Sequence, residues 1–137
     1  MTPTTQLHVL LVEDDPDTRE VLRLILEYDG MTVTPAHDGL HALEQLEEIH
    51  RRDPLTPCAI VLDYMMPRVS GAEFRARQLA NPDIAGVPVI VVSAVSDLES
   101  RARALHPYGF LQKPIDPDQL TALVREAGDA YLSRVSH

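Results

Sequence analysis

Residues 61–71 have the sequence Val61-Leu62-Asp63-Tyr64-Met65-Met66-Pro67-Arg68-Val69-Ser70-Gly71. The apolar run from Ala59 to Leu62 predicts a buried strand, and that strand ends on a single acid, Asp63. A loop containing Pro67 and Gly71 follows, and a helical pattern begins after it. A carboxylate at the carboxyl end of a buried strand lies at the edge of an α/β sheet where such folds bind ligands. We therefore take Asp63 as the centre of the candidate site.

The rest of the chain alternates predicted strands with predicted helices. Apolar runs predict further strands at 8–12, 31–36, 87–92 and 109–112. Helices are predicted after the capping acids Asp15 and Asp38, over residues 71–80 and 97–105, and after Asp116-Pro117. Nearly continuous apolar strands indicate burial on both faces. The sequence thus predicts an α/β fold with one parallel sheet between two layers of helices, formed by residues 7–132, with tails at 1–6 and 133–137.

Length and charge narrow the range of functions. A chain of 137 residues fits one domain, and its formal charge of −9 argues against direct binding of nucleic acid, which needs a basic face. No apolar run approaches the roughly 20 residues of a membrane span, and the first residues lack the pattern of a signal peptide. We expect a cytoplasmic protein. The single cysteine, Cys58, is predicted to be a core residue in a reducing compartment.

The strand ends of the predicted sheet meet at one edge, which we call the rim. Glu13 and Asp14 follow the first strand, Asp63 the third, Ser93 the fourth and Lys113 the fifth. Three carboxylates in one place repel each other unless a cation lies between them. Oxygen ligands without cysteine or paired histidine favour Mg²⁺, and Mn²⁺ can take its place. Such a site suits phosphoryl transfer to a free carboxylate, with a lysine and a hydroxyl to hold the phosphoryl oxygens.

Four short segments at these strand ends match a known family. They are Val12-Glu13-Asp14, Leu62-Asp63-Tyr64-Met65-Met66-Pro67 with Gly71, Val92-Ser93-Ala94, and Phe110-Leu111-Gln112-Lys113-Pro114. With these segments the sequence, over about residues 7–132, resembles the receiver domain of bacterial response regulators, the CheY-like module of two-component signalling. The resemblance implies a flavodoxin-like, doubly wound sheet of five strands in the order 2-1-3-4-5, flanked by five helices.

The resemblance also implies roles at the metal site. Asp63 matches the phospho-acceptor, which takes a phosphoryl group from a histidine with the help of Mg²⁺. Asp14 matches a direct ligand of the metal, and Glu13 matches a ligand that acts through water. The backbone carbonyl of Met65 matches the third protein ligand. In this family the receiver catalyses its own phosphorylation and dephosphorylation without being an enzyme in the ordinary sense.

Three further positions match residues that respond to phosphorylation. Ser93 matches the switch hydroxyl that moves toward the phosphoryl group. Lys113 matches the lysine of the phosphoryl pocket, whose bond to the following Pro114 is usually cis in the family. Phe110 matches the aromatic switch residue that turns inward when the hydroxyl moves, although it lacks the hydroxyl of the common tyrosine.

The implied partners are proteins. A sensor histidine kinase or a histidine phosphotransfer protein would supply the phosphoryl group. An output protein would bind the face made by the helix at 97–105, the strand at 109–112 and the last helix. Residues 106–109, His-Pro-Tyr-Gly, depart from the family pattern near this face. We expect a monomer or a weak homodimer, and either a stand-alone receiver or a piece of a longer regulator.

The residues of the rim also leave two other functions open. A hydrolase with an aspartyl-phosphate intermediate would need a second acid two residues after Asp63, where this chain has Met65. A binding or dimerisation module that works without phosphorylation would not need the acid set that the chain retains. A nucleotide site is disfavoured, because the turn after the first strand is acidic and has no glycine-rich loop.

Side chains outside the rim are given structural roles. Tyr108 and Tyr131 are assigned to packing. The arginines are predicted to lie on solvated faces of helices at positions 75, 77, 101 and 103.

Overall fold

A five-stranded parallel sheet forms the centre of the computed structural model, which describes residues 6–64, 66, 70–94 and 103–135. The strand order is β2-β1-β3-β4-β5, as the sequence resemblance implied. The strands are β1 (His8–Val12), β2 (Thr32–Ala36), β3 (Ala59–Asp63), β4 (Val89–Ser93) and β5 (Gly109–Gln112). The predicted α/β class and all five predicted strands are therefore confirmed.

Four helices are present among the described residues: α1 (Pro16–Tyr28), α2 (Gly39–Arg52), α3 (Gly71–Ala80) and α5 (Pro117–Val135). The fifth expected helix, over residues 97–105, falls mostly on positions 95–102, which lie outside the described residues. Helix α5 continues to Val135, past the predicted domain end at residue 132. None of the described helices combines the length and the apolar character that crossing a membrane requires.

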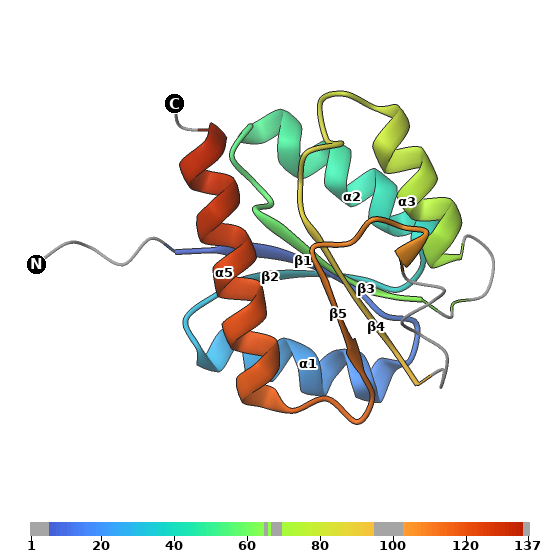
Figure 1. The fold of residues 1–137 in the computed structure, drawn as a ribbon, viewed down its shortest axis with the longest axis vertical. Coiled ribbons are helices and arrows are strands. Elements are labelled where there is room, and N and C mark those ends of the chain that lie inside the picture. The colour runs from blue at the N-terminus through green and yellow to red at the C-terminus, as the bar shows by residue number, and fades with distance from the viewer. Residues whose placement is uncertain (1–5, 65, 67–69, 95–102, 136–137) are drawn as a thin grey trace, which may run out of the picture.

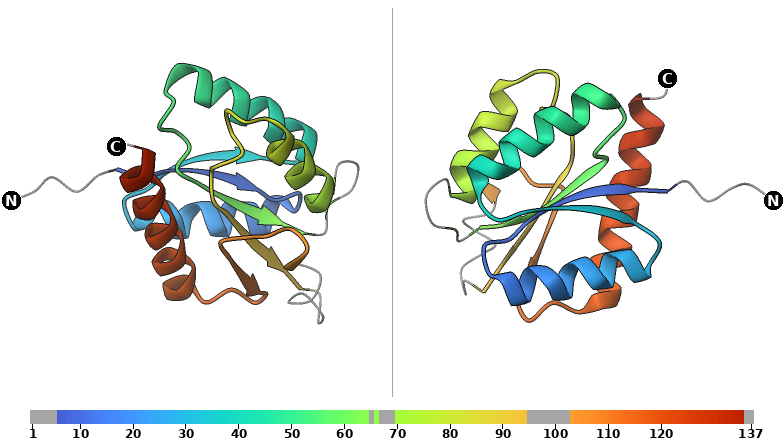
Figure 2. Two further views of the ribbon diagram at one scale, coloured as in Figure 1. Left: turned by 45° about the horizontal axis from the view of Figure 1, so that its top comes forward. Right: turned by 180° about the vertical axis from the view of Figure 1, so that it is seen from behind.

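The helices form two layers around the sheet. α1 and α5 cover one face, and α2 and α3 cover the other (Figure 1, Figure 2). The central strands β3 and β4 are buried along their whole length, whereas the edge strand β5 alternates between half-buried and exposed residues. Burial on both faces explains why the central strands are apolar without alternation. The carboxyl ends of all five strands consequently meet at one edge, as predicted for the rim.

Side-chain caps fix where the helices begin. The carboxylate of Asp15 accepts a hydrogen bond from the amide of Thr18 at 2.9 Å, and Asp38 accepts one from His41 at 2.7 Å. Both caps agree with the sequence prediction. Ser70 caps α3 in the same way, with its hydroxyl accepting from the amide of Glu73 at 3.1 Å. Each cap satisfies an amide that has no partner within its helix.

The prediction for Arg75 was wrong. Its side chain is only 7 % exposed, although Arg77 and Arg103 are exposed as predicted and Arg101 lies outside the described residues. The Arg75 guanidinium donates to the backbone oxygens of Leu105 and His106, both at 2.9 Å, and to the side-chain oxygen of Gln78 at 2.7 Å. A local helical pattern could not reveal this, because the acceptors that make the burial tolerable come mainly from a distant loop.

The structure also shows where Cys58, Tyr108 and Tyr131 lie. Cys58 is buried, and its thiol donates to the oxygen of His8 at 3.3 Å, so the prediction of a core cysteine is confirmed. Burial raises the pKa of this thiol. Tyr131 is buried, in agreement with its assignment to packing, whereas Tyr108 is 42 % exposed.

Gln78 links three parts of the fold, and its replacement tests that link. Its amide nitrogen donates to the oxygens of Ile84 and Val87 at 2.9 and 3.0 Å, while its oxygen accepts from Arg75. We expect Gln78→Leu to lower the free energy of unfolding by roughly 2–4 kcal/mol, because buried polar groups lose their partners. Urea unfolding measures this change. The neighbouring exposed Leu79 provides the control, since Leu79→Gln should change stability by less than about 0.5 kcal/mol. Equal losses for both variants would contradict the structural role of Gln78.

Candidate phosphoryl-acceptor site

Three carboxylates lie together at the rim. β1 and β3 are neighbours in which Val12 pairs with Leu62, so Glu13 and Asp63 follow directly on adjacent strands. Glu13 and Asp63 are buried and Asp14 is half-buried. One oxygen from each of Glu13, Asp14 and Asp63 lies within 4.8 Å of the others. The expected convergence of these three acids is thus present.

Lys113 reaches this cluster from β5. Its amine donates to the Oε1 atom of Glu13 at 2.6 Å and lies 3.8 Å from the Oδ2 atom of Asp63. The Lys113–Pro114 bond is cis, in agreement with the expectation from the family resemblance. A single amine therefore faces two of the three acids at the rim.

The electrostatics of Glu13 and Lys113 reflect this contact. Burial works to raise the pKa of Glu13, but its contacts with Asp63 and Lys113 outweigh burial and hold that pKa below its usual value. Burial works to lower the pKa of Lys113, but Glu13, Asp63 and Asp14 outweigh it and raise that pKa. In the described part of the chain the rim thus combines three acids with one lysine amine. Two unit charges about 4.8 Å apart interact with roughly 1–4 kcal/mol between water-like and surface-like dielectric constants.

The donor set fits a hard cation. All three acids offer oxygen ligands, as Mg²⁺ prefers. The Oε2 atom of Glu13 is buried and has no hydrogen-bond partner among the described residues. A buried carboxylate oxygen without a partner is costly, and a cation or its bound water would satisfy it. The residues at the rim therefore fit Mg²⁺, while Met65, whose carbonyl was predicted as a further ligand, lies outside the described residues.

Ser93 is placed by the end of β4. It pairs with Gln112 of β5 in the strand register, and its backbone oxygen accepts from the amide of Lys113 at 2.8 Å. Ser93 is fully buried, and β4 lies next to β3, where Asp63 pairs with Val92. The four strand ends named in the sequence are thus brought to the same edge of the sheet.

Phe110 lies apart from this cluster. It is 37 % exposed on β5 and pairs with Val91 of β4 in the register. The side chain is therefore not part of the buried core. Its predicted inward movement stays a prediction.

Two residues that support the rim were not identified from the sequence. Arg19 of α1 donates from its guanidinium to the backbone oxygen of Glu13 at 2.8 Å and thereby holds the acidic turn. At Gly71 a Cβ atom would lie 2.9 Å from the backbone oxygen of Asp63, so α3 can begin this close to β3 only with glycine there. Gly71 was noted as a loop residue and as part of the family match, but its contact with β3 was not predicted. The sequence around Arg19 did not indicate that it contacts the rim, because its acceptor is a backbone atom.

Comparison with known proteins agrees with this geometry. A family model described as the response regulator receiver domain matches residues 9–125. A 14.6 kDa protein of the sodA1 3′ region in Leptolyngbya boryana is 36 % identical over 128 residues, which cover 92 % of this chain and 93 % of that protein. Response regulator MprA of Mycobacterium ulcerans is 36 % identical over 87 % of this chain, which spans about half, 49 %, of MprA.

Solved structures show the same fold. A sensor protein from Polaromonas sp. JS666 is 27 % identical and superimposes with a TM-score of 0.81, covering 93 % of this chain and 99 % of that one. The chemotaxis protein CheY4 of Vibrio cholerae has a TM-score of 0.78 at 23 % identity, with 90 % of this chain and 99 % of CheY4 covered. At 23 % identity, the similarity to CheY4 shows a shared fold and no more.

The charge balance at the rim predicts how stability responds to Mg²⁺. Adding Mg²⁺ should raise the melting temperature of the wild-type chain, because a ligand that binds only the folded state stabilises it. We expect Asp14→Asn to stabilise the metal-free chain by about 1 kcal/mol, since one repelling charge is removed. The same variant should lose most of the stabilisation by Mg²⁺. Differential scanning fluorimetry in EDTA and in MgCl₂ measures both effects.

Asp129→Asn is the matched control for this experiment. Asp129 is exposed on α5 and carries the same charge, but it lies outside the acid cluster. Its variant should respond to Mg²⁺ like the wild type. If Asp14→Asn and Asp129→Asn respond alike, the three acids do not form a cation site.

Proposed function

The chain belongs to the response regulator receiver domain family, and from this premise we propose that Asp63 accepts the phosphoryl group in a two-component phosphorelay. The observation that carries this proposal is the position of its carboxylate, buried beside Glu13 and Asp14 and 3.8 Å from the amine of Lys113. A phosphorelay receiver acts in the compartment that holds the catalytic part of its kinase, so we place it in the cytoplasm.

The transfer step is a displacement at phosphorus. One carboxylate oxygen of Asp63 forms a bond to phosphorus, while the bond from phosphorus to the imidazole nitrogen of a phosphohistidine breaks. The electron pair of that bond stays on the imidazole nitrogen. Glu13, Asp14 and Asp63 would hold Mg²⁺, which when bound supplies positive charge beside the phosphoryl oxygens.

Lys113 and Ser93 would respond to the new charge on Asp63. The amine of Lys113 already lies near Asp63 and can exchange its bond to Glu13 for one to a phosphoryl oxygen. The hydroxyl of Ser93 can donate to another phosphoryl oxygen if the end of β4 moves toward Asp63. Phe110 of the adjacent strand would then turn inward. The phosphoryl group shifts this equilibrium only by its stronger contacts in the second state.

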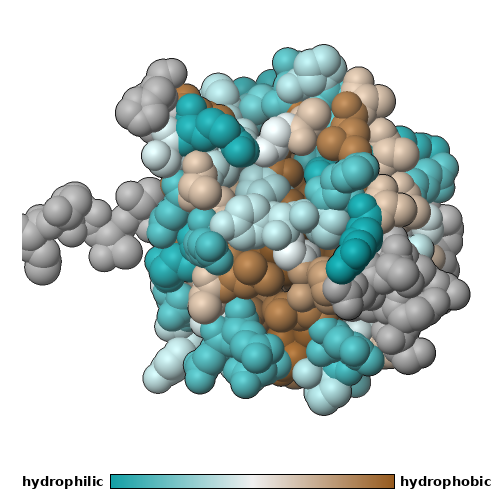
Figure 3. Space-filling view, viewed as in Figure 1, coloured by the Kyte–Doolittle hydropathy of each residue, from teal (hydrophilic) through white to brown (hydrophobic). Residues whose placement is uncertain are grey.

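The output surface would be the face around β5 and α5. Figure 3 shows apolar surface gathered over this face, with polar side chains around it. Tyr108 and Phe110 are exposed, and partly buried Leu123 of α5 packs against Gly109, which lies between them in the chain. Movement of Phe110 would change this apolar surface and hence its fit to an output protein.

The phosphohistidine donor would dock beside the rim on α1. Val21 and Leu24 of this helix are 55 % and 52 % exposed. Val21 lines an open cavity of about 430 Å³ together with Lys113 and Ile115, so apolar surface runs up to the candidate site itself. Exposed apolar side chains next to a reactive group are suited to a protein that must bring its histidine to Asp63.

The alternative functions receive no specific support. The position two residues after Asp63 is Met65, whose side chain cannot transfer the proton that an aspartyl-phosphate hydrolase needs. A module that acts without phosphorylation would leave the buried, unpartnered oxygen of Glu13 unexplained.

Phosphorylation of the purified chain tests the role of Asp63. With acetyl phosphate and Mg²⁺, we expect intact-mass spectrometry to show the addition of one phosphoryl group. Asp63→Asn should abolish the addition, because the amide lacks the nucleophilic carboxylate oxygen. Asp83→Asn, a change on the connection between α3 and β4, should leave it intact. Phosphorylation of Asp63→Asn at the wild-type level would refute the assignment.

The docking surface predicts a difference between protein and small-molecule donors. Leu24→Ser should slow phosphotransfer from a cognate kinase by roughly tenfold, as expected for the loss of one well-buried interface side chain. It should leave phosphorylation by acetyl phosphate unchanged, because a small donor needs no docking surface. Radiolabelled phosphotransfer measures the first rate and intact-mass spectrometry the second. Leu79→Ser on α3, with similar exposure, is the control. A kinase that does not distinguish Leu24→Ser from this control does not dock on α1.

A further inference from the structure

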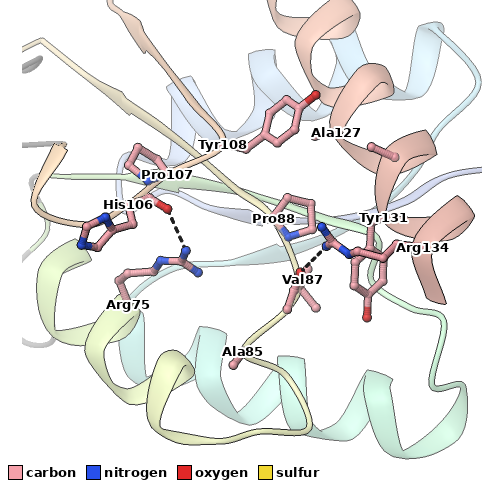
Figure 4. Close-up of a pocket in the computed structure, with 12 residues that line it drawn as sticks. Arg75, Ala85, Val87, Pro88, His106, Pro107, Tyr108, Ala127, Tyr131 and Arg134 are labelled. Atoms are coloured by element: carbon pink, nitrogen blue, oxygen red, sulfur yellow. Dashed lines mark hydrogen bonds between the residues drawn. The ribbon is translucent and has the colours of Figure 1, made fainter.

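A second pocket lies at the end of the sheet opposite the rim. It has a volume of about 200 Å³ and is formed by the residues that lead into β4 and β5, with α3 and α5 on either side (Figure 4). Twelve described residues line it, and none of them is an aspartate or a glutamate. The chain has 21 acidic residues against 12 basic ones, so a pocket with arginines and no acid is unusual for it.

Arg75 supplies one side of this pocket. Its side chain is more than nine-tenths buried, and each of its three nitrogens donates to a neutral oxygen, that of Leu105, Gln78 or His106. A guanidinium has five N–H groups, so two remain beyond these three bonds. No carboxylate lies within ion-pair distance of Arg75 among the described residues. Burial accordingly lowers the pKa of Arg75, and its charge is left without a counter-ion.

Arg134 supplies the opposite side. It extends from α5 toward the pocket and faces Arg75 across it (Figure 4). Its guanidinium donates to the oxygen of Gly86 at 3.1 Å and lies 5.7 Å from the centre of the Tyr131 ring. Like Arg75, it has no carboxylate partner among the described residues. By contrast, Arg77 and Arg125 lie 2.9 and 2.7 Å from carboxylate oxygens.

We propose that this pocket binds a small organic carboxylate between Arg75 and Arg134. Guanidinium groups match carboxylates with paired hydrogen bonds, and a buried positive charge without a counter-ion gains most from an anion. Val87, Pro88 and Tyr131 provide apolar wall for the carbon skeleton of such a ligand. The volume is below the roughly 300–1,000 Å³ of pockets for drug-sized ligands, so the ligand has only a few heavy atoms.

The carboxylate could be that of a free metabolite or that of an acidic side chain, and the experiment separates these sources. The ¹⁵N-labelled chain is titrated at constant ionic strength with succinate, benzoate and acetyl-aspartate amide, and with phosphate and chloride for comparison. We expect saturable shifts of the amide signals of Gly86, Val87 and Tyr108 with at least one carboxylate. Tighter binding of succinate or benzoate identifies a free acid, and tighter binding of acetyl-aspartate amide identifies a side chain.

Variants of the two arginines locate the binding. Arg134→Gln should weaken binding by roughly tenfold, because one charge-assisted pair of hydrogen bonds is lost. Arg125→Gln on the same helix and Arg77→Gln on α3 should leave it unchanged. Arg134 is exposed, so its variant keeps the buried contacts of Arg75 and should fold. The proposal is overturned if no carboxylate gives saturable shifts, if phosphate or chloride gives the same shifts, or if Arg134→Gln binds like the controls.

Discussion

The mutual repulsion of three carboxylates at one edge of the sheet is the constraint on which the site depends. Parallel strands bring Glu13, Asp14 and Asp63 within 4.8 Å, and one lysine amine contacts the cluster from β5. Among the described residues one lysine amine contacts three acids, so a bound cation would stabilise the rim. The rest of the fold holds this arrangement in place: Arg19 fixes the acidic turn, and the missing side chain at Gly71 lets α3 begin against β3.

Much of this arrangement could be predicted from the sequence because its signals are local. Strand β5 and helix α3 have the predicted bounds, and the caps Asp15 and Asp38 lie where an acid precedes a helical pattern. The convergence of the strand ends followed from the parallel sheet, since such a sheet directs all carboxyl ends to one edge. The strand order itself required the family resemblance, because no local pattern states which strands are neighbours.

What could not be predicted depends on contacts between distant segments. Arg75 has the sequence environment of a surface arginine, yet backbone oxygens thirty residues later in the chain, at Leu105 and His106, make its burial possible. Arg19 contacts a backbone atom, so its identity alone does not indicate its acceptor. The 42 % exposure of Tyr108 likewise had no local signal, because it depends on the position of the following strand β5 at the edge of the sheet.

The same two strands connect the two charged regions of the molecule. β4 and β5 begin beside the arginine-lined pocket and end at Ser93 and Lys113 on the rim. Three acids therefore cluster at one end of the sheet. At the other end lie two arginines that have no carboxylate partner within the described part of the chain. An anion bound between Arg75 and Arg134 would contact the segments that lead into the strands proposed to move on phosphorylation. By linkage, any effect of such an anion on phosphorylation would be matched by an effect of phosphorylation on its binding.

The most direct test of the central claim is a crystal structure of the chain grown with Mg²⁺ and beryllium fluoride, which imitates a phosphoryl group on a carboxylate. Our account predicts a cation bonded to oxygens of Asp14 and Asp63 at about 2.1 Å. It also predicts a beryllium fluoride group bonded through beryllium to an oxygen of Asp63, with the Lys113 amine turned from Glu13 toward that group. Density without a cation, with Lys113 still bonded to Glu13 and Asp63 unmodified, would contradict it.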